Sequence, residues 1–155
     1  MSMDFEERND EMLEESTSKS IRVVMIEPGK CAYETEIGTD LSDLQMAVGG
    51  LIEPYYPFEE EVCIVCNDES KFNGMFPNRA IRDDNGEIMD VIFGPFFICD
   101  CSSEDFKSLS DEQAKRYKEM YFDPERFYMK GGKIHSEKYK LEPKREVKSR
   151  NDEAR

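Results

Sequence analysis

The sequence predicts an α+β fold, in which a small mixed sheet made from hairpins carries one packed helix and is followed by a C-terminal helix. Three observations support this class. Runs rich in β-branched and aromatic residues alternate with Gly, Pro and Asn turn signals at short intervals. Two segments carry helix-capping residues, and internal repeats are not evident. The order of the elements is compatible with a β-grasp-like topology.

The first predicted element is a hairpin. Residues 22–26 are rich in apolar and β-branched side chains, and residues 31–37 alternate as a second strand. Pro28 and Gly29 lie between these runs and are typical of a turn. We therefore expect two adjacent strands joined by a short turn.

A helix is predicted to follow this hairpin. Side-chain oxygens of Thr39 and Asp40 can accept hydrogen bonds from the free N–H groups of a first helical turn. Gly49 and Gly50 end the helix, because glycine readily adopts the left-handed conformation that follows a last turn. Helical spacing predicts one buried stripe, formed by Leu41, Leu44 and Val48.

In the middle of the chain, the sequence predicts an edge segment, a central strand and a second hairpin. Residues 51–58 contain two prolines, which cannot donate to a strand ladder, so an irregular edge segment is expected. Residues 62–66 are continuously apolar, as a central strand requires. The Asn-Gly pair within residues 83–86 predicts a type I′ turn, and the returning strand covers residues 88–101 with an interruption near Gly94.

A second helix is predicted to begin at Ser110. Ser110 and Gln113 have the spacing of a capping box, in which each side chain bonds the other residue's backbone N–H. Asp123 followed by Pro124 ends the helix, because proline disfavours the helical conformation of the residue before it.

These elements divide the chain into three parts. Residues 1–20 form an acidic tail that is predicted to be disordered, and residues 21–128 form a single α+β domain. Residues 129–155 hold nine basic and five acidic side chains with few large apolar ones, and are predicted to be a disordered basic tail.

Charge is unevenly distributed along the chain. Residues 21–100 hold five basic and sixteen acidic side chains, a net charge of −11, within a total of −14. This balance argues against direct nucleic-acid binding by the core, because the core repels phosphates. It favours a partner protein with a basic surface, although better solubility alone explains the composition equally well. The oligomeric state is left open by the sequence.

The sequence predicts a cytoplasmic protein. No segment approaches the roughly 20 consecutive apolar residues that a membrane span needs. The first residues are acidic, whereas a secretory signal begins with basic residues followed by apolar ones. The five cysteines are an odd number without a secretory signal, and are expected to be reduced.

Four cysteines have to be tested as a metal site: Cys63, Cys66, Cys99 and Cys101. Zinc-binding pairs spaced like Cys63 and Cys66 converge from a tight turn. Here Ile64 and Val65 lie between the two, which favours a strand on which residues three apart face opposite sides. Buried free thiols are therefore favoured over zinc, and no metal or other cofactor is predicted.

Catalytic chemistry finds little support. The single histidine, His135, lies in the predicted basic tail, so a histidine-based triad cannot be built in the core. A nucleophilic cysteine needs nearby cations to lower its pKa, whereas the surroundings are acidic. The protein is therefore predicted not to be an enzyme.

Two arginines in the acidic region suggest a binding site. Arg79 and Arg82 present planar guanidinium groups suited to carboxylates and phosphates. If they lie on one strand they face opposite sides, so that at most one of them enters a single pocket, and Arg79, beside Asn78, is the candidate. The competing interpretation is that both arginines pair with acidic residues across the hairpin. Candidate ligand contacts are Asn67, Asn73, Asn78, Arg79, Arg82, Tyr55 and Tyr56.

A second candidate site is an acidic surface that would meet a basic protein. Its carboxylates come from a run between two predicted strands and from the second hairpin turn. Adjacent carboxylates on turns are otherwise solvated surface groups. The candidates are Glu59, Glu60, Glu61, Asp83 and Asp84.

Five short motifs resemble an uncharacterised family of small domains over about residues 21–128. They occur in order at residues 26–30 (IEPGK), 48–53 (VGGLIE), 56–58 (YPF), 78–83 (NRAIRD) and 90–94 (DVIFG). The resemblance is to proteins of Gram-positive bacteria, their phages and mobile elements, often encoded near antirestriction genes. It implies no established reaction and no catalytic residue.

By association, this resemblance implies an accessory protein that modulates or evades host defence. One expected mechanism is binding of a host or phage protein through the acidic surface, with a charge pattern like that of DNA. The alternative is sequestration of a nucleotide-type signalling molecule in a pocket near Arg79. The charge of the domain favours the first mechanism, because an anionic ligand would have to cross an unfavourable field.

Overall fold

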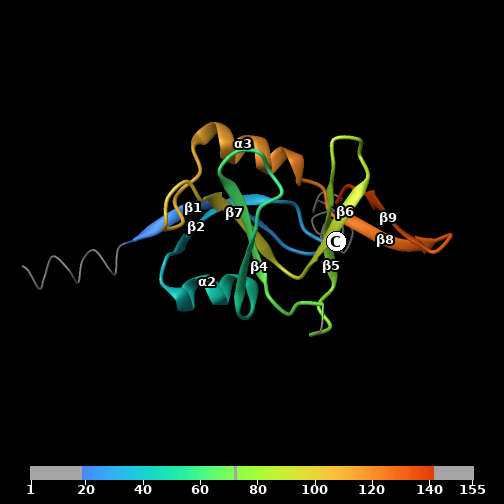
Figure 1. The fold of residues 1–155 in the computed structure, drawn as a ribbon, viewed down its shortest axis with the longest axis horizontal. Helices are drawn as coiled ribbons and strands as arrows, with labels where there is room; N and C mark the ends of the chain where they lie inside the picture. The colour runs from blue at the N-terminus through green and yellow to red at the C-terminus, as the bar shows by residue number, and fades with distance from the viewer. Residues whose placement is uncertain (1–18, 72, 142–155) are drawn as a thin grey trace, which may run out of the picture.

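The structure, a computed structural model, describes residues 19–71 and 73–141 of the chain. Within these residues, strands dominate and two helices lie among them (Figure 1). The elements are β1 (Ser20–Ile26), β2 (Tyr33–Gly38), α2 (Leu41–Val48), β3 (Ile52–Tyr55), β4 (Val62–Asn67), β5 (Pro77–Arg82), β6 (Ile88–Phe93), β7 (Phe96–Asp100), α3 (Asp111–Met120), β8 (Glu125–Lys130) and β9 (Lys133–Lys138).

A five-stranded sheet forms the centre of the molecule, with strand order β2-β1-β7-β4-β3. The expected α+β class is confirmed. The sheet is antiparallel at every pairing between the described strands, whereas a mixed sheet was expected. β5 with β6 and β8 with β9 form two further two-stranded sheets.

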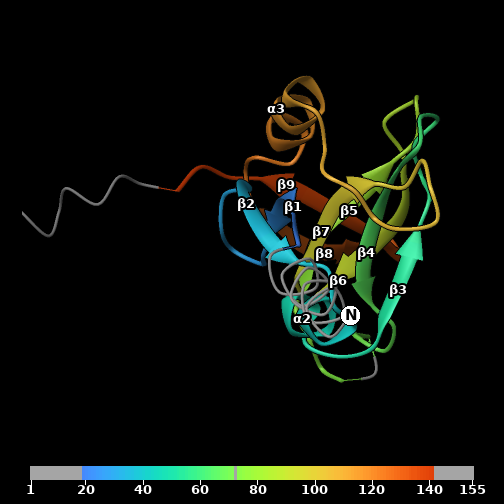
Figure 2. The same cartoon turned by 90° about the vertical axis from the view of Figure 1, so that its left-hand side faces the viewer.

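The two helices cover opposite faces of the central sheet in both views (Figures 1 and 2). Alternation of side chains along the strands divides the core accordingly. One cluster joins α3 and the β5–β6 hairpin to the sheet through Ala114, Tyr117, Ile81, Ile92, Val24, Ile64 and Ile98. The other joins α2 to the opposite face through Leu44, Val48, Val23, Cys63, Val65, Phe97 and Cys99.

The predicted early elements are present, with one correction to the buried stripe. Strands β1 and β2 form the expected hairpin, and Asp40 and Gly49 flank α2 as its N-cap and C-cap. Leu44 and Val48 are buried, but Leu41 is 59% exposed. Leu41 is the first residue of the helix, and helical spacing alone does not show which positions of a stripe are covered.

The second hairpin has a different turn and a different continuation from those expected. Asn85 does not have the positive φ that a type I′ turn requires; instead Gly86 has φ of 82°. The chain after this turn forms two strands in two sheets, because Gly94 redirects it between β6 and β7. Gly94 has φ of 76°, and a side chain there would collide with Met75.

The C-terminal region contains more structure than expected. The capping box at Ser110 is formed as predicted, and α3 begins at the next residue. Residues 129–138, however, belong to the β8–β9 hairpin rather than to a disordered tail. The rest of the expected basic tail from residue 142, and the expected acidic tail over residues 1–18, lie outside the described residues.

Candidate functional site

Asn78 begins a buried polar network on β5. Asn78 and Arg79 are consecutive, yet both side chains are fully buried. A register irregularity between Pro77 and Arg79 allows this, since it breaks the strict alternation of faces. The Asn78 amide donates to the backbone carbonyls of Ile26 at 2.9 Å and Gly94 at 2.8 Å. These bonds tie β5 to the end of β1 and to the β6–β7 turn.

The Arg79 guanidinium extends this network to two further segments. Its Nε donates to the Tyr121 carbonyl at 3.0 Å, and Nη2 donates to the Lys30 carbonyl at 2.7 Å. Nη1 donates to Oδ1 of Asn78 at 2.9 Å. A single side chain thus joins β5, the end of α3 and the β1–β2 turn.

Burial and a nearby carboxylate act in opposite directions on this cation. Desolvation lowers the pKa of Arg79, while the negative charge of Glu125 favours the charged form. Glu125 is itself buried, and its Oε1 accepts a hydrogen bond from the Ala80 backbone N–H at 3.1 Å. Sequence reasoning missed Glu125, because a glutamate after Pro124 gives no signal of burial.

The burial of Arg79 contradicts its expected role as a ligand contact. Its donors are directed at internal carbonyls, and no surface of the side chain is exposed. Arg82 is exposed, so the two arginines have different environments, although register irregularities on both sides of the Arg79–Ile81 segment interrupt the regular alternation of faces on which the expectation was based. Arg82 does not pair with the hairpin carboxylates either; it donates to the Gly86 carbonyl at 2.8 Å and to Ser136 Oγ at 2.6 Å.

Two of the other candidates, Tyr55 and Asn67, meet in a cleft of about 250 Å³ between β3, β4 and β6. The Asn67 amide also joins the end of β4 to the end of α2, because it donates to the Val48 carbonyl at 3.1 Å. The charged side chains of the cleft are Glu53, Asp68, Lys71 and Asp90. Three carboxylates against one lysine, which itself pairs with Asp90 at 3.4 Å, disfavour a phosphate-bearing ligand.

The remaining ligand candidates do not join this cleft. Tyr56 is 63% exposed and Asn73 is also exposed, and neither side chain lines the cleft. The seven residues proposed from the sequence therefore divide into an internal network, a small acidic cleft and isolated surface positions. They were grouped by chemical type, and three-dimensional proximity does not follow from type.

The acidic candidates between β3 and β4 have different environments. Glu59 and Glu61 are exposed. Glu60 is half-buried, because Arg116 of α3 donates to its Oε1 at 3.0 Å and the Tyr117 hydroxyl donates to the same oxygen. Glu60 therefore attaches this loop to α3, whereas Glu59 and Glu61 are left at the surface.

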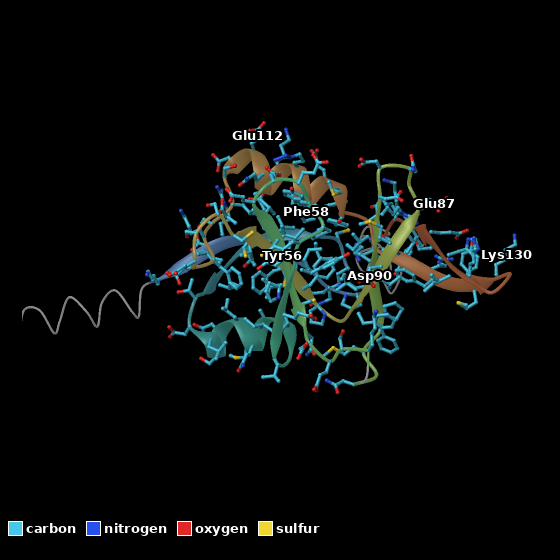
Figure 3. All side chains as sticks on the ribbon, in the orientation of Figure 1. Tyr56, Phe58, Glu87, Asp90, Glu112 and Lys130 are labelled. Carbon is cyan, nitrogen blue, oxygen red and sulfur yellow. The ribbon has the colours of Figure 1, made fainter. Side chains whose placement is uncertain are left out.

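Asp83 and Asp84 are exposed in the β5–β6 turn. Asp83 Oδ1 also accepts from the backbone N–H groups of Asn85 and Glu87, each at 2.9 Å, which holds the turn. Figure 3 labels Glu87 on this hairpin. The carboxylate surface of this hairpin is thus held on a short, internally bonded turn.

The cysteines are arranged as strand geometry predicted. Cys63 and Cys66 lie in the two different core clusters, on opposite faces of the central sheet. Burial raises the pKa of the Cys66 thiol to about 11. Cys63 is directly opposite Cys99, whose hydrogen bond lowers the pKa of the Cys63 thiol. Within residues 19–71 and 73–141, no three His, Cys, Asp or Glu side chains are placed to hold a metal ion.

The β8–β9 hairpin is the main feature that the sequence interpretation overlooked. Its two strands flank Gly131 and Gly132, which have φ of 62° and 78°. Two six-residue runs separated by a Gly-Gly pair are a signal of a hairpin. The high lysine content of the region concealed this signal.

Among the helices of the described residues, none has the length and apolar character needed to cross a membrane. Neither the curated proteins nor the solved structures contain a match to this chain. The model of a domain of unknown function, DUF3846, matches residues 21–122, as expected for an uncharacterised small domain, and the chain therefore belongs to the DUF3846 family.

Proposed function

We propose that this protein is a non-enzymatic accessory protein of a phage or mobile element. It modulates host defence by binding a host or phage protein that has a basic surface. The contact surface is acidic and includes Glu59, Glu61, Asp83 and Asp84, with Glu60 anchoring the first pair to α3. The anti-defence role is supported by the antirestriction genes that often lie near the genes of the proteins that this sequence resembles.

The observation that supports binding is a set of exposed carboxylates without cationic partners. In the described part of the chain, Glu59, Glu61, Asp83 and Asp84 take part in no ion pair. Two of the five basic residues of the region 21–100 cannot offset them, because Arg79 is buried against carbonyls and Arg82 bonds neutral groups. The surface field stays negative, which attracts a basic partner.

The geometry gives less support to the alternative of a nucleotide-binding pocket. Arg79 offers no exposed donor, and the cleft beside Tyr55 and Asn67 is acidic. A nucleotide would bring phosphates into a region of like charge. We therefore retain the protein-binding function alone.

Affinity capture from host lysate, followed by binding measurements with the purified captured protein, tests the proposal. We expect a basic protein whose complex weakens steeply as salt is raised, because exposed charges are screened over about 8 Å at physiological ionic strength. A variant combining Glu59→Gln, Glu61→Gln, Asp83→Asn and Asp84→Asn is expected to lose at least tenfold in affinity.

The matched control neutralises four exposed carboxylates elsewhere. It combines Glu36→Gln, Asp40→Asn, Glu104→Gln and Asp105→Asn, and changes the net charge by the same amount. It is expected to weaken the complex much less than the first variant. Equal weakening by both variants would show that total charge decides binding, and a salt-insensitive complex would argue against an electrostatic surface.

A further inference from the structure

The β8–β9 hairpin is an arm that extends beyond the family domain. It follows the segment matched by the family, which ends at residue 122. The hairpin extends from the body beside β5 and β6 (Figure 1), and Lys130 lies at its far end (Figure 3). In contrast to the acidic body, its exposed surface is basic.

The two faces of this hairpin have different surroundings. On the inner face, Ser136 Oγ accepts a hydrogen bond from Arg82, and Glu125 accepts one from Ala80 of β5. Directly opposed residues share a face in an antiparallel pair. The outer face therefore holds three opposed pairs, which are Arg126 with Glu137, Tyr128 with His135, and Lys130 with Lys133.

Aromatic rings lie at the centre of the outer face. The Tyr128 and His135 rings are stacked, with centroids 5.4 Å apart and planes 13° from parallel. Tyr128 is 41% exposed, although it is a large ring. At the base of the arm, the Arg126 guanidinium lies 4.8 Å from the Tyr139 ring centroid. The face thus offers planar groups along its length.

Three cations flank these rings on the outer face, which carries one carboxylate, that of Glu137 opposite Arg126. Arg126, Lys130 and Lys133 are exposed, and none of them forms an ion pair with any residue that the structure describes. Lys130 and Lys133 are directly opposite each other, and like charges in that position destabilise a hairpin. An anionic ligand bound between them would remove this repulsion.

We propose that the outer face of the β8–β9 hairpin binds single-stranded nucleic acid. Arg126, Lys130 and Lys133 contact phosphates, and the Tyr128–His135 pair supports an unpaired base. Exposed rings flanked by cations are the usual means of binding single strands without sequence preference. A duplex would leave the rings unused, because its bases are already stacked on one another. The acidic body excludes nucleic acid from the rest of the surface, which directs it to the arm.

Protection of a strand edge is the other role that lysines of a hairpin perform. Lysine on an exposed edge discourages pairing with another chain. That role accounts for Lys133 and Lys138 on β9, but it does not require an exposed Tyr128 stacked on His135. The combination of rings and cations on one face is what favours a nucleic-acid ligand.

Fluorescence anisotropy with short labelled DNA and RNA oligonucleotides, using the full chain, tests the proposal. Wild-type protein is expected to bind single strands at low salt. Three phosphate contacts predict a slope of about −2 for the logarithm of affinity against the logarithm of salt concentration. Lys130→Glu combined with Lys133→Glu is expected to weaken binding at least tenfold. Tyr128→Ala alone should also weaken it, on the order of tenfold.

Two control variants locate the binding. Lys107→Glu with Lys115→Glu makes the same change in charge at exposed positions outside the hairpin and should leave affinity nearly unchanged. A second control reverses Lys144, Arg145, Lys148 and Arg150, which lie beyond the described residues. The proposal is overturned if binding is absent, if the first control weakens it equally, or if only the second control abolishes it. Duplex binding that is tighter and unaffected by Tyr128→Ala would also overturn it.

Discussion

Arg79 illustrates how a buried cation can serve a structural purpose in an acidic protein. Its desolvation is compensated by carbonyl oxygens of Lys30 and Tyr121 and by the charge of Glu125. Removing one partner of a buried charged network costs more stability than replacing the whole network by apolar groups. The polar groups left behind remain buried without hydrogen bonds. Arg79 and Asn78 therefore act as connectors between segments that are distant in sequence.

Arg79→Met is expected to destabilise the protein by about 3–5 kcal/mol, since it leaves buried carbonyls unsatisfied. Arg82→Ala is the matched control, because Arg82 is exposed, and should cost less than about 1 kcal/mol. Urea unfolding of both variants measures the difference. Similar losses for the two substitutions would contradict the structural role of Arg79.

The thiols are expected to differ in reactivity with pH. Burial raises the pKa of Cys66 and of Cys101 to about 11 in each case, so both remain largely protonated at pH 8. Because the thiolate is the reactive form, labelling of the half-buried Cys101 should be slow at pH 8 and should accelerate as pH rises toward 11. Mass spectrometry of maleimide-labelled peptides follows each site. Rapid labelling of Cys101 at pH 8, with no acceleration at higher pH, would contradict the raised pKa.

At the scale of elements, the two helix N-termini are stabilised in different ways. The Ser110 side chain accepts from the Gln113 backbone N–H, and Gln113 returns the bond. Asp40 occupies the same position before α2, yet its side chain makes no capping hydrogen bond. The sequence predicted both helix starts, but it could not distinguish a formed cap from an unformed one.

Ser110→Ala is expected to reduce the free energy of unfolding by about 1 kcal/mol, because one helix N–H loses its acceptor. Asp40→Ala should cost less than half as much, since no capping bond is lost. Thermal or urea unfolding of the two variants provides the comparison. If Asp40→Ala proved the more costly substitution, the assignment of the caps would be wrong.

Element boundaries were predicted well where residues next to the boundary determine it, and poorly where contacts with distant segments determine it. The Asp40 and Ser110 starts follow from capping residues, and Gly49 marks the end of α2. The separation of β6 from β7 into different sheets follows from their partners, since β6 pairs with β5 whereas β7 pairs with β1 and β4, and no local pattern contains these pairings. Leu41 was predicted to be buried, but burial requires a facing surface.

At the scale of the whole molecule, charge is separated between an acidic body and a basic arm. The total charge is −14, and the region 21–100 alone contributes −11. Mutual repulsion of the body's carboxylates opposes compaction, and salt screens this repulsion. The proposed protein contact and the proposed nucleic-acid contact lie on surfaces of opposite charge. Substitutions can therefore abolish one contact without altering the charged residues of the other.

Raising NaCl from low to physiological concentration is expected to increase the melting temperature. A gain of about 1 kcal/mol corresponds to about 2–4 °C for a chain of this size. Sodium sulfate also strengthens apolar burial, so NaCl is the appropriate salt for the comparison. A melting temperature that falls as NaCl is added would show that attractive ion pairs outweigh the net repulsion of the body.

The sequence by itself determined the α+β class, the helix starts, the central strand β4 and the opposite orientation of Cys63 and Cys66. These properties follow from local capping chemistry and from the two-residue period of strands. Only the tertiary structure decided that Arg79 is internal, that Glu125 is buried beside β5, and that residues 125–138 form an arm. Burial depends on which distant segments come together, and a single sequence does not encode that proximity in any local pattern.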